Sequence, residues 1–188
     1  MAVLSIRIIG DPVLHSPAAP VDEITPEVRS LIDDMFETMD AAPGVGLAAP
    51  QVGVGLRIYT YSYVDDNDAP WRGVIINPEL WMVPLEPGLP DPDDESEGCL
   101  SFPGERFPLR RSERVIVTGV DAEGADVRVE VDGWRARIMQ HEFDHLDGVL
   151  YVDRLDDRDW KTAQKIVKKR RWGVPGNSWM PGVDDLEE

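Results

Sequence analysis

The segment 141–145, HEFDH, has the residue types and the spacing of a metal site on a helix. Residues four apart in a helix lie on one face, about 5–6 Å from each other, so both imidazoles can reach one ion with bonds of about 2.0–2.1 Å. Glu142 lies beside that face and can receive the proton of a metal-bound water. The simpler alternative is a solvated helix with two incidental histidines, but the apolar residues Met139, Phe143 and Leu146 favour a buried helix.

A catalytic metal needs a third protein ligand. Tyr151 stands where a metzincin would have its third histidine, and the only glutamates after the motif are Glu187 and Glu188. The aspartates that follow are not in a setting that marks them as ligands, so the third ligand is expected upstream. The upstream candidates are His15 and Cys99. Cys99 is the better placed of the two, because its glycine and leucine neighbours let the backbone approach a ligand, although a lone cysteine is otherwise a small buried hydrophobe.

Composition and charge exclude several classes of protein. The 188 residues are 42% hydrophobic and 29% charged, which is typical of a soluble globular domain and excludes a wholly disordered chain. The formal net charge of −17 argues against a nucleic-acid binder, so we expect no DNA partner. The sequence contains no apolar run of about 18 residues, the length that would predict a membrane span. Arg7 interrupts the opening apolar stretch, which therefore does not resemble a secretory signal, and the single cysteine fits a cytoplasmic protein.

Periodicity predicts the elements that position the motif. Helical spacing predicts three helices, one that begins at Thr25-Pro26 and ends at Pro43-Gly44, and two at 134–146 and 160–172. Alternation predicts strands at 56–64, 73–76 and 115–120, and a hairpin at 121–124 that leads into a strand containing Val127, Val129 and Val131. The acidic, proline-rich segment 84–97 is expected to be a mobile, solvated loop, and the tail, about 173–188, to be irregular. We expect a single α+β domain over 1–188.

Three segments of the chain resemble the signature motifs of peptide deformylases, in the same order and with similar separations: GVGLAAPQ at 44–51, EGCLS at 97–101 and QHEFDH at 140–145. The likeness covers most of the chain, with 65–96 and the tail as the variable parts. The acidic insertion at 84–96 and the tail resemble variants of actinobacterial-type members. The chain departs from many relatives at 41–43, where Ala-Ala-Pro replaces acidic residues. Contacts of those acidic residues with longer substrates are therefore not carried over.

The resemblance implies a fold, a reaction and a catalytic set. The fold is α+β, with small antiparallel sheets around a central helix that carries the histidine pair. The reaction removes the formyl group from the N-terminal formyl-methionine of newly made polypeptides and releases formate. Cys99, His141 and His145 would hold one divalent ion, Fe²⁺ in the cell, with Zn²⁺, Ni²⁺ or Co²⁺ also accepted. Glu142 would be the general base and acid, while Gln51 and the backbone N–H of Leu100 would hold the formyl oxygen.

The resemblance also implies how substrate binds. Gly44 and Gly46 by themselves fit a plain turn as well as a peptide that lies against the loop as an added strand, and the resemblance favours peptide binding. The methionine pocket is expected near Val45, Ile138 and His141, with Gly98 and Arg106 as further substrate-binding residues. Apart from the resemblance, a formyl group has only hydrogen where acetyl has methyl, so we expect a tight wall near Gly46 and Leu100 to exclude acetylated peptides. Arg111 and Asp144 match a pair that braces the metal helix.

The last predicted helix carries a basic patch made up of Lys161, Lys165, Lys168, Lys169, Arg170 and Arg171. It is either a solvated face favoured by the helix dipole or a dock for transient contact with ribosomal RNA.

Two other functions remain open from the sequence. One is an HExxH zinc peptidase of another lineage, which would not need Cys99 as a ligand. The other is a non-catalytic, metal-stabilised binding module, whose site would be closed by four protein ligands and would leave Glu142 without a role.

Overall fold

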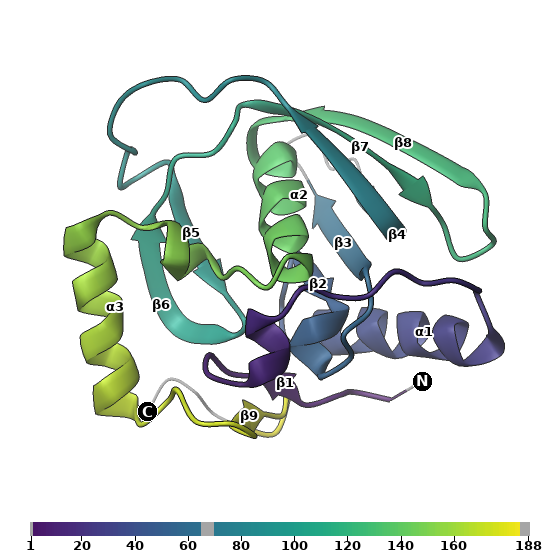
Figure 1. Ribbon diagram of the computed structural model, residues 1–188, viewed down its shortest axis with the longest axis horizontal. Coiled ribbons are helices and arrows are strands. Elements are labelled where there is room, and N and C mark those ends of the chain that lie inside the picture. The colour runs from purple at the N-terminus through teal and green to yellow at the C-terminus, as the bar shows by residue number, and fades with distance from the viewer. Residues whose placement is uncertain (1, 65–69, 185–188) are drawn as a thin grey trace.

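A computed structural model describes residues 2–64 and 70–184 of the chain, and Figure 1 traces its elements. Helix α2 (Gly133–Leu146) lies at the centre, against a five-stranded antiparallel sheet with strand order β2-β3-β4-β7-β8. Two further antiparallel pairs, β5-β6 and β1-β9, complete the fold. The predicted α+β class, with small antiparallel sheets around the helix that carries HEFDH, is confirmed.

Four of the five strands of the large sheet coincide with segments whose alternation predicts strands, and the fifth, β2, lies in the 44–51 motif, where no strand was predicted. The members of this sheet are β2 (Gly46–Ala48), β3 (Ile58–Val64), β4 (Pro70–Met82), β7 (Arg114–Val120) and β8 (Asp126–Asp132). Strands β7 and β8 pair along their whole length from Arg114↔Asp132 to Val120↔Asp126, as the predicted hairpin requires. Strand β4 extends well beyond the predicted 73–76, because pairing with β3 and β7 carries it past the apolar stretch that alternation marked.

Local capping chemistry sets the ends of the two outer helices. In α1 (Pro26–Ala41), the Thr25 hydroxyl accepts a hydrogen bond from Val28 N at 3.4 Å. Helix α3 (Asp157–Arg170) begins three residues before the predicted start, because the Asp156 carboxylate accepts hydrogen bonds from Arg158 N and Asp159 N. It ends where Arg171 adopts a left-handed conformation, with φ of 57°.

Helix α2 is buried on nearly all sides, although it carries several polar residues. A buried polar side chain is tolerated only when it is hydrogen-bonded. Gln140 meets this condition through Ser112, whose N–H donates to Oε1 at 3.0 Å and whose carbonyl accepts from Nε2 at 2.8 Å. The helix is therefore held in one orientation by specific contacts as well as by apolar packing.

Besides β2, four strands of the described residues lie outside the sequence-based expectations. Strands β5 (Ser96–Cys99) and β6 (Phe102–Pro108) form a hairpin, so the segment 84–97 is exposed over most of its length but enters a strand at its end. The expectation of an irregular tail is wrong at β9 (Ser178–Trp179), which pairs with β1 (Ile6–Arg7). Trp179 is buried there, and its burial gives the short pair a reason to form.

Within the described ranges, no helix combines the length and the apolarity that crossing a bilayer requires.

Candidate metal and catalytic site

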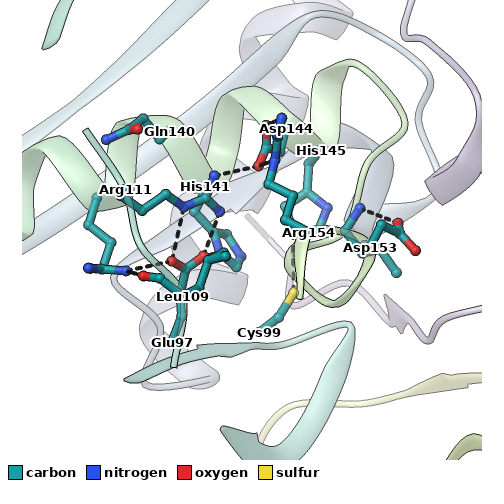
Figure 2. Close-up of polar contacts among 12 residues, drawn as sticks. Glu97, Cys99, Leu109, Arg111, Gln140, His141, Asp144, His145, Asp153 and Arg154 are labelled. Carbon is teal, nitrogen blue, oxygen red and sulfur yellow. Dashed lines mark hydrogen bonds and ion pairs between the residues drawn. The ribbon is translucent and has the colours of Figure 1, made fainter. Parts of the chain in front are cut away.

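Helix α2 and the end of β5 bring three potential metal ligands together (Figure 2). His141 and His145 lie one turn apart on the same face of α2, and Cys99 faces them from β5. The Cys99 Sγ lies 3.3 Å from His145 Nε2, and one ligand atom from each of the three residues lies within 4.8 Å of the others. Two donors arranged tetrahedrally at about 2.1–2.3 Å from one ion are separated by a similar distance. His15, the other upstream candidate, is on a surface turn, where it accepts a hydrogen bond from Gly10 N.

Glu97 holds His141 from the side opposite the helix backbone. Figure 2 shows its carboxylate between the His141 ring and the Arg111 guanidinium. The Glu97 Oε1 lies 2.6 Å from His141 Nδ1, and Arg111 donates to both Glu97 oxygens at 2.7 and 3.1 Å. An Nδ1–H that donates to a carboxylate leaves Nε2 as the nitrogen free to bind a metal, and it also fixes the plane of the ring.

A second buried carboxylate braces the same helix one turn further on. Asp144 accepts hydrogen bonds from Arg111 at 2.6 Å and from Arg154 at 2.5 and 2.6 Å. The Arg111–Asp144 pair that the sequence predicted is therefore present. Because Arg111 bridges Glu97 and Asp144, strand β5, α2 and the segment after it are joined by one network of buried charges.

The electrostatics of this cluster favour a positive charge among the ligands. Burial alone would raise the pKa of Glu97, but Arg111 and His141 outweigh it and hold that pKa well below its usual range. Burial opposes protonation of His141, yet the neighbouring Cys99 and Glu97 raise the pKa of His141 well above its usual value. A thiolate and a carboxylate that together draw a proton onto an imidazole also favour a cation in its place.

Glu142 is buried like Glu97, but its pKa is shifted in the opposite direction. Burial raises the pKa of Glu142 to about 7, and its Oε2 has no hydrogen-bond partner within the described residues. Its carboxylate lies against Gly46 of β2: a Cβ added at residue 46 would lie 2.2 Å from Glu142 Oε1. A side chain at residue 46 would therefore displace this carboxylate from its observed position, a reason for glycine that neither a plain turn nor peptide binding supplied.

Gln51 has its amide oriented toward the ligand cluster. Its Oε1 accepts a hydrogen bond from Ala48 N at 2.8 Å, so Nε2 points the other way, to within 3.7 Å of Cys99 Sγ and 3.3 Å of Ser101 Oγ. The amide donor is thus aimed at the space beside the cysteine. Leu100, which follows Cys99 in the chain, borders the same space. Its side chain packs against Gly44, where an added Cβ would lie 2.9 Å from Leu100 Cδ1.

A cleft of about 670 Å³ opens over these groups. The structure places all of the sequence-predicted substrate residues along its walls, namely Val45, Gly46, Gly98, Arg106 and Ile138. Cys99, His141, Glu142, Gln51 and Leu100 also border it, while His145 lies deeper and is 1% exposed.

Sequence reasoning missed several residues that help to form the site. Trp134, Arg137, Trp179 and Asp184 line the cleft, and Glu97 orients a ligand. A signal for Glu97 was present, because strand alternation places residues 97 and 99 on one face. Trp179 carried no signal, since it lies in a segment without periodicity.

Comparisons with known proteins place the chain among relatives that match it over most of its length. The model of the family described as Polypeptide deformylase matches residues 3–161. The peptide deformylase of Rhodococcus opacus (strain B4) is 52% identical, covering 97% of this chain and 95% of its own length. The peptide deformylase of Mycolicibacterium paratuberculosis is 51% identical, covering 97% and 96%. The structure of a peptide deformylase from Ehrlichia chaffeensis in complex with actinonin is similar with a TM-score of 0.78 at 36% identity, covering 91% of this chain and 99% of that one.

Proposed function

The chain belongs to the peptide deformylase family, and from this premise we propose a role for each residue of the site. The enzyme removes the formyl group from the N-terminal formyl-methionine of newly made polypeptides and releases formate. One observation carries the assignment of roles: Cys99, His141 and His145 converge at a cleft that Glu142 also lines, and Glu142 Oε2 has no hydrogen-bond partner among the described residues.

Cys99, His141 and His145 hold one divalent ion. The donor set fits such an ion, because one thiolate and two neutral imidazoles suit Fe²⁺, Zn²⁺ and their neighbours and leave a net charge of +1. Glu97 supports this role by accepting a hydrogen bond from the Nδ1–H of His141. When bound, the ion supplies Lewis acidity toward the formyl oxygen and makes water more acidic. Ferrous iron is the physiological ion in this proposal, with zinc, nickel and cobalt as substitutes.

Glu142 moves the proton. Water adds to the formyl carbon, the C–N bond breaks, and formate and a free amine leave. The unpartnered Oε2 of Glu142 accepts a proton from the attacking water and passes it to the amine nitrogen as the bond breaks. A pKa near neutrality suits both halves of this task, because the group must accept a proton and then release it.

Gln51 and Leu100 stabilise the oxygen that becomes negatively charged. The Gln51 Nε2 is fixed by the hydrogen bond on its Oε1, so its orientation need not change during the reaction. The backbone N–H of Leu100 is the second donor in this proposal. Removal of one such donor typically lowers the rate about 10²–10³-fold.

The cleft walls select the substrate. Gly46 is pressed against Glu142, which leaves little room near the formyl carbon, and an acetyl methyl group would have to occupy that space. The methionine side chain enters beside Ile138 and His141, near Val45. The edge of β2 that does not pair with β3 accepts the peptide main chain as an added strand, while Gly98 and Arg106 flank it.

Formate release from formyl-Met-Ala, with acetyl-Met-Ala as the control, tests this function. We expect rapid release from the formyl peptide, almost none from the acetyl peptide, and close to one divalent ion per chain after anaerobic purification. Comparable rates on both peptides would indicate a general amidase. Retention of metal by Cys99→Ala would favour a peptidase of another lineage, and indifference of the rate to Glu142→Gln would favour a binding module.

The cellular setting follows from the substrate. Nascent polypeptides are made in the cytoplasm, and the free thiol of Cys99 fits a reducing compartment, so we place the enzyme there. The exposed lysines of α3, Lys165, Lys168 and Lys169, form a local positive surface on a chain with a formal net charge of −17, and we propose that they contact ribosomal RNA transiently. Reversal of these three charges should weaken salt-sensitive ribosome pelleting and leave hydrolysis of short peptides unchanged. Unaltered pelleting would leave only a solvated helix face.

A further inference from the structure

The C-terminal segment that follows α3, residues 173–184, runs along the N-terminal strand and then reaches the cleft. In Figure 1 it passes from the end of α3 to β9, beside β1. Main-chain hydrogen bonds fix its path: Gly173 N donates to Ile9 O at 2.9 Å, and Ile8 N donates to Asn177 O at 3.0 Å. Residues 178 and 179 then pair with residues 7 and 6. Although it has little regular structure, the segment is anchored.

The anchoring depends on a close approach of two backbones. Gly10 has φ of 101°, and a Cβ added to it would lie only 2.2 Å from the Cα of Gly173. The next residue, Asp11, accepts a hydrogen bond from Gly176 N at 3.2 Å. A turn near the N-terminus is therefore shaped to receive the C-terminal segment.

Trp179 links this segment to the catalytic loop. Its side chain is buried, and its indole Nε1 donates to the carbonyl oxygen of Leu100 at 2.9 Å. The N–H of the same peptide group, that of Ser101, donates to Cys99 Sγ at 3.4 Å. The peptide unit between residues 100 and 101 is thus held at its oxygen by the tail and at its nitrogen by a metal ligand. Ser101 O in turn accepts from Ile9 N at 2.9 Å.

The position of this peptide unit matters because Leu100 carries one of the two proposed oxyanion donors. The Leu100 N–H lies in the preceding peptide plane, which joins the held plane at the Leu100 Cα. A held 100–101 plane therefore restricts rotation about the backbone bonds of Leu100 and, through them, the direction of its N–H. Trp179 also lines the cleft itself, together with Gly182 and Asp184 from the end of the same segment.

We propose that Trp179 is a positioning residue for deformylation: its indole N–H holds the Leu100 carbonyl and thereby orients the Leu100 N–H. This inference rests on the function proposed above. It assigns the C-terminal segment a place in the active site, although that segment contributes no group that reacts.

The test compares two tryptophans of the C-terminal region in the full-length, metal-loaded enzyme. Trp179→Phe keeps an aromatic ring in the cleft wall and removes the N–H donor. Trp172→Phe is the matched control, because its ring packs on Phe102 at 5.2 Å between centroids and it is not among the residues that line the cleft. For each protein, kcat and KM on formyl-Met-Ala-Ser are measured together with metal content and melting temperature.

We expect Trp179→Phe to lower kcat about tenfold, a part of the loss typical for removal of an oxyanion donor, with KM within about twofold and metal content unchanged. Trp172→Phe should keep the native kcat even if its melting temperature falls. Hydrogen–deuterium exchange gives a readout that does not depend on activity: amides at 99–102 should exchange faster in Trp179→Phe and not in Trp172→Phe.

Two results would overturn the inference. One is a Trp179→Phe enzyme with native kcat and native exchange at 99–102. The other is an equal loss of kcat in both variants that follows lost metal or lower melting temperature, since this would make Trp179 a packing residue only. If the native enzyme released no formate, the proposed function would fail instead, and the exchange measurement would still decide whether Trp179 holds the loop.

Discussion

The Glu97→Gln substitution tests whether the buried charge network serves the metal site or only the fold. Glu97 is 3% exposed and contacts His141, Arg111 and Arg137. Glutamine has nearly the same size, but it removes the negative charge from the centre of these three donors. One of its two terminal atoms becomes a donor itself and must face another donor.

The magnitude follows from these contacts. A hydrogen bond to a charged group contributes about 1.5–3 kcal/mol, and removal of one partner from a buried ion pair costs about 3–5 kcal/mol. Arg111 and Arg137 keep Asp144 and Glu95 as partners, so we expect a loss near the lower limit, about 3 kcal/mol. Loss of the carboxylate behind a metal-binding histidine typically lowers metal affinity about 10–100-fold.

The assay separates these two effects. Affinity for Zn²⁺ or Co²⁺ is measured by competition with a chelator, and stability by urea unfolding. The matched control is Asp144→Asn, which also removes a buried carboxylate from its arginines but does not remove a hydrogen bond to a histidine. We expect both variants to lose stability and only Glu97→Gln to lose metal affinity. Equal metal affinities in the two variants would refute the role of Glu97 in orienting His141.

Three further predictions concern Cys99, Glu142 and Gly46. Cys99→Ala should lose most of its metal, whereas Glu142→Gln should keep its metal and have a rate lowered by about 10²–10⁴. Metal analysis and formate assays on the same anaerobic preparations of both variants check these two expectations. In metal-depleted protein, Glu142 stays protonated in the native state at pH values between 4.5, its pKa in the unfolded chain, and about 7, its pKa in the folded protein. The free energy of unfolding therefore falls as the pH rises through that range. Glu142→Gln should gain up to about 3 kcal/mol relative to the native chain between pH 5 and pH 8 in urea unfolding, and parallel pH profiles would contradict this. Gly46→Ala should lower kcat at least about tenfold by displacing the Glu142 carboxylate, with metal retained; a fully active variant would show that the carboxylate can move.

Local features of the chain were sufficient for the metal motif and for most elements. The i, i+4 spacing of His141 and His145 places both rings on one helix face whatever surrounds the helix. The N-cap at Thr25 and the alternation on both sides of the 121–124 turn predicted α1 and the β7–β8 hairpin for the same reason. Each of these depends on residues within a few positions of one another. The order of three short motifs then indicated the family.

Only the tertiary structure decided what surrounds those motifs. Glu97 meets His141 across 44 residues of chain, and Trp179 meets Leu100 across 79. Gly46 leaves room for a side chain from α2, because the Glu142 carboxylate lies where a Cβ of residue 46 would be. The sequence by itself determined the histidine pair and the helix that presents it, because local backbone geometry is set by neighbouring residues. The orientation of those ligands and the walls of the cleft depend on contacts between distant segments, and no local periodicity encodes which segments will meet.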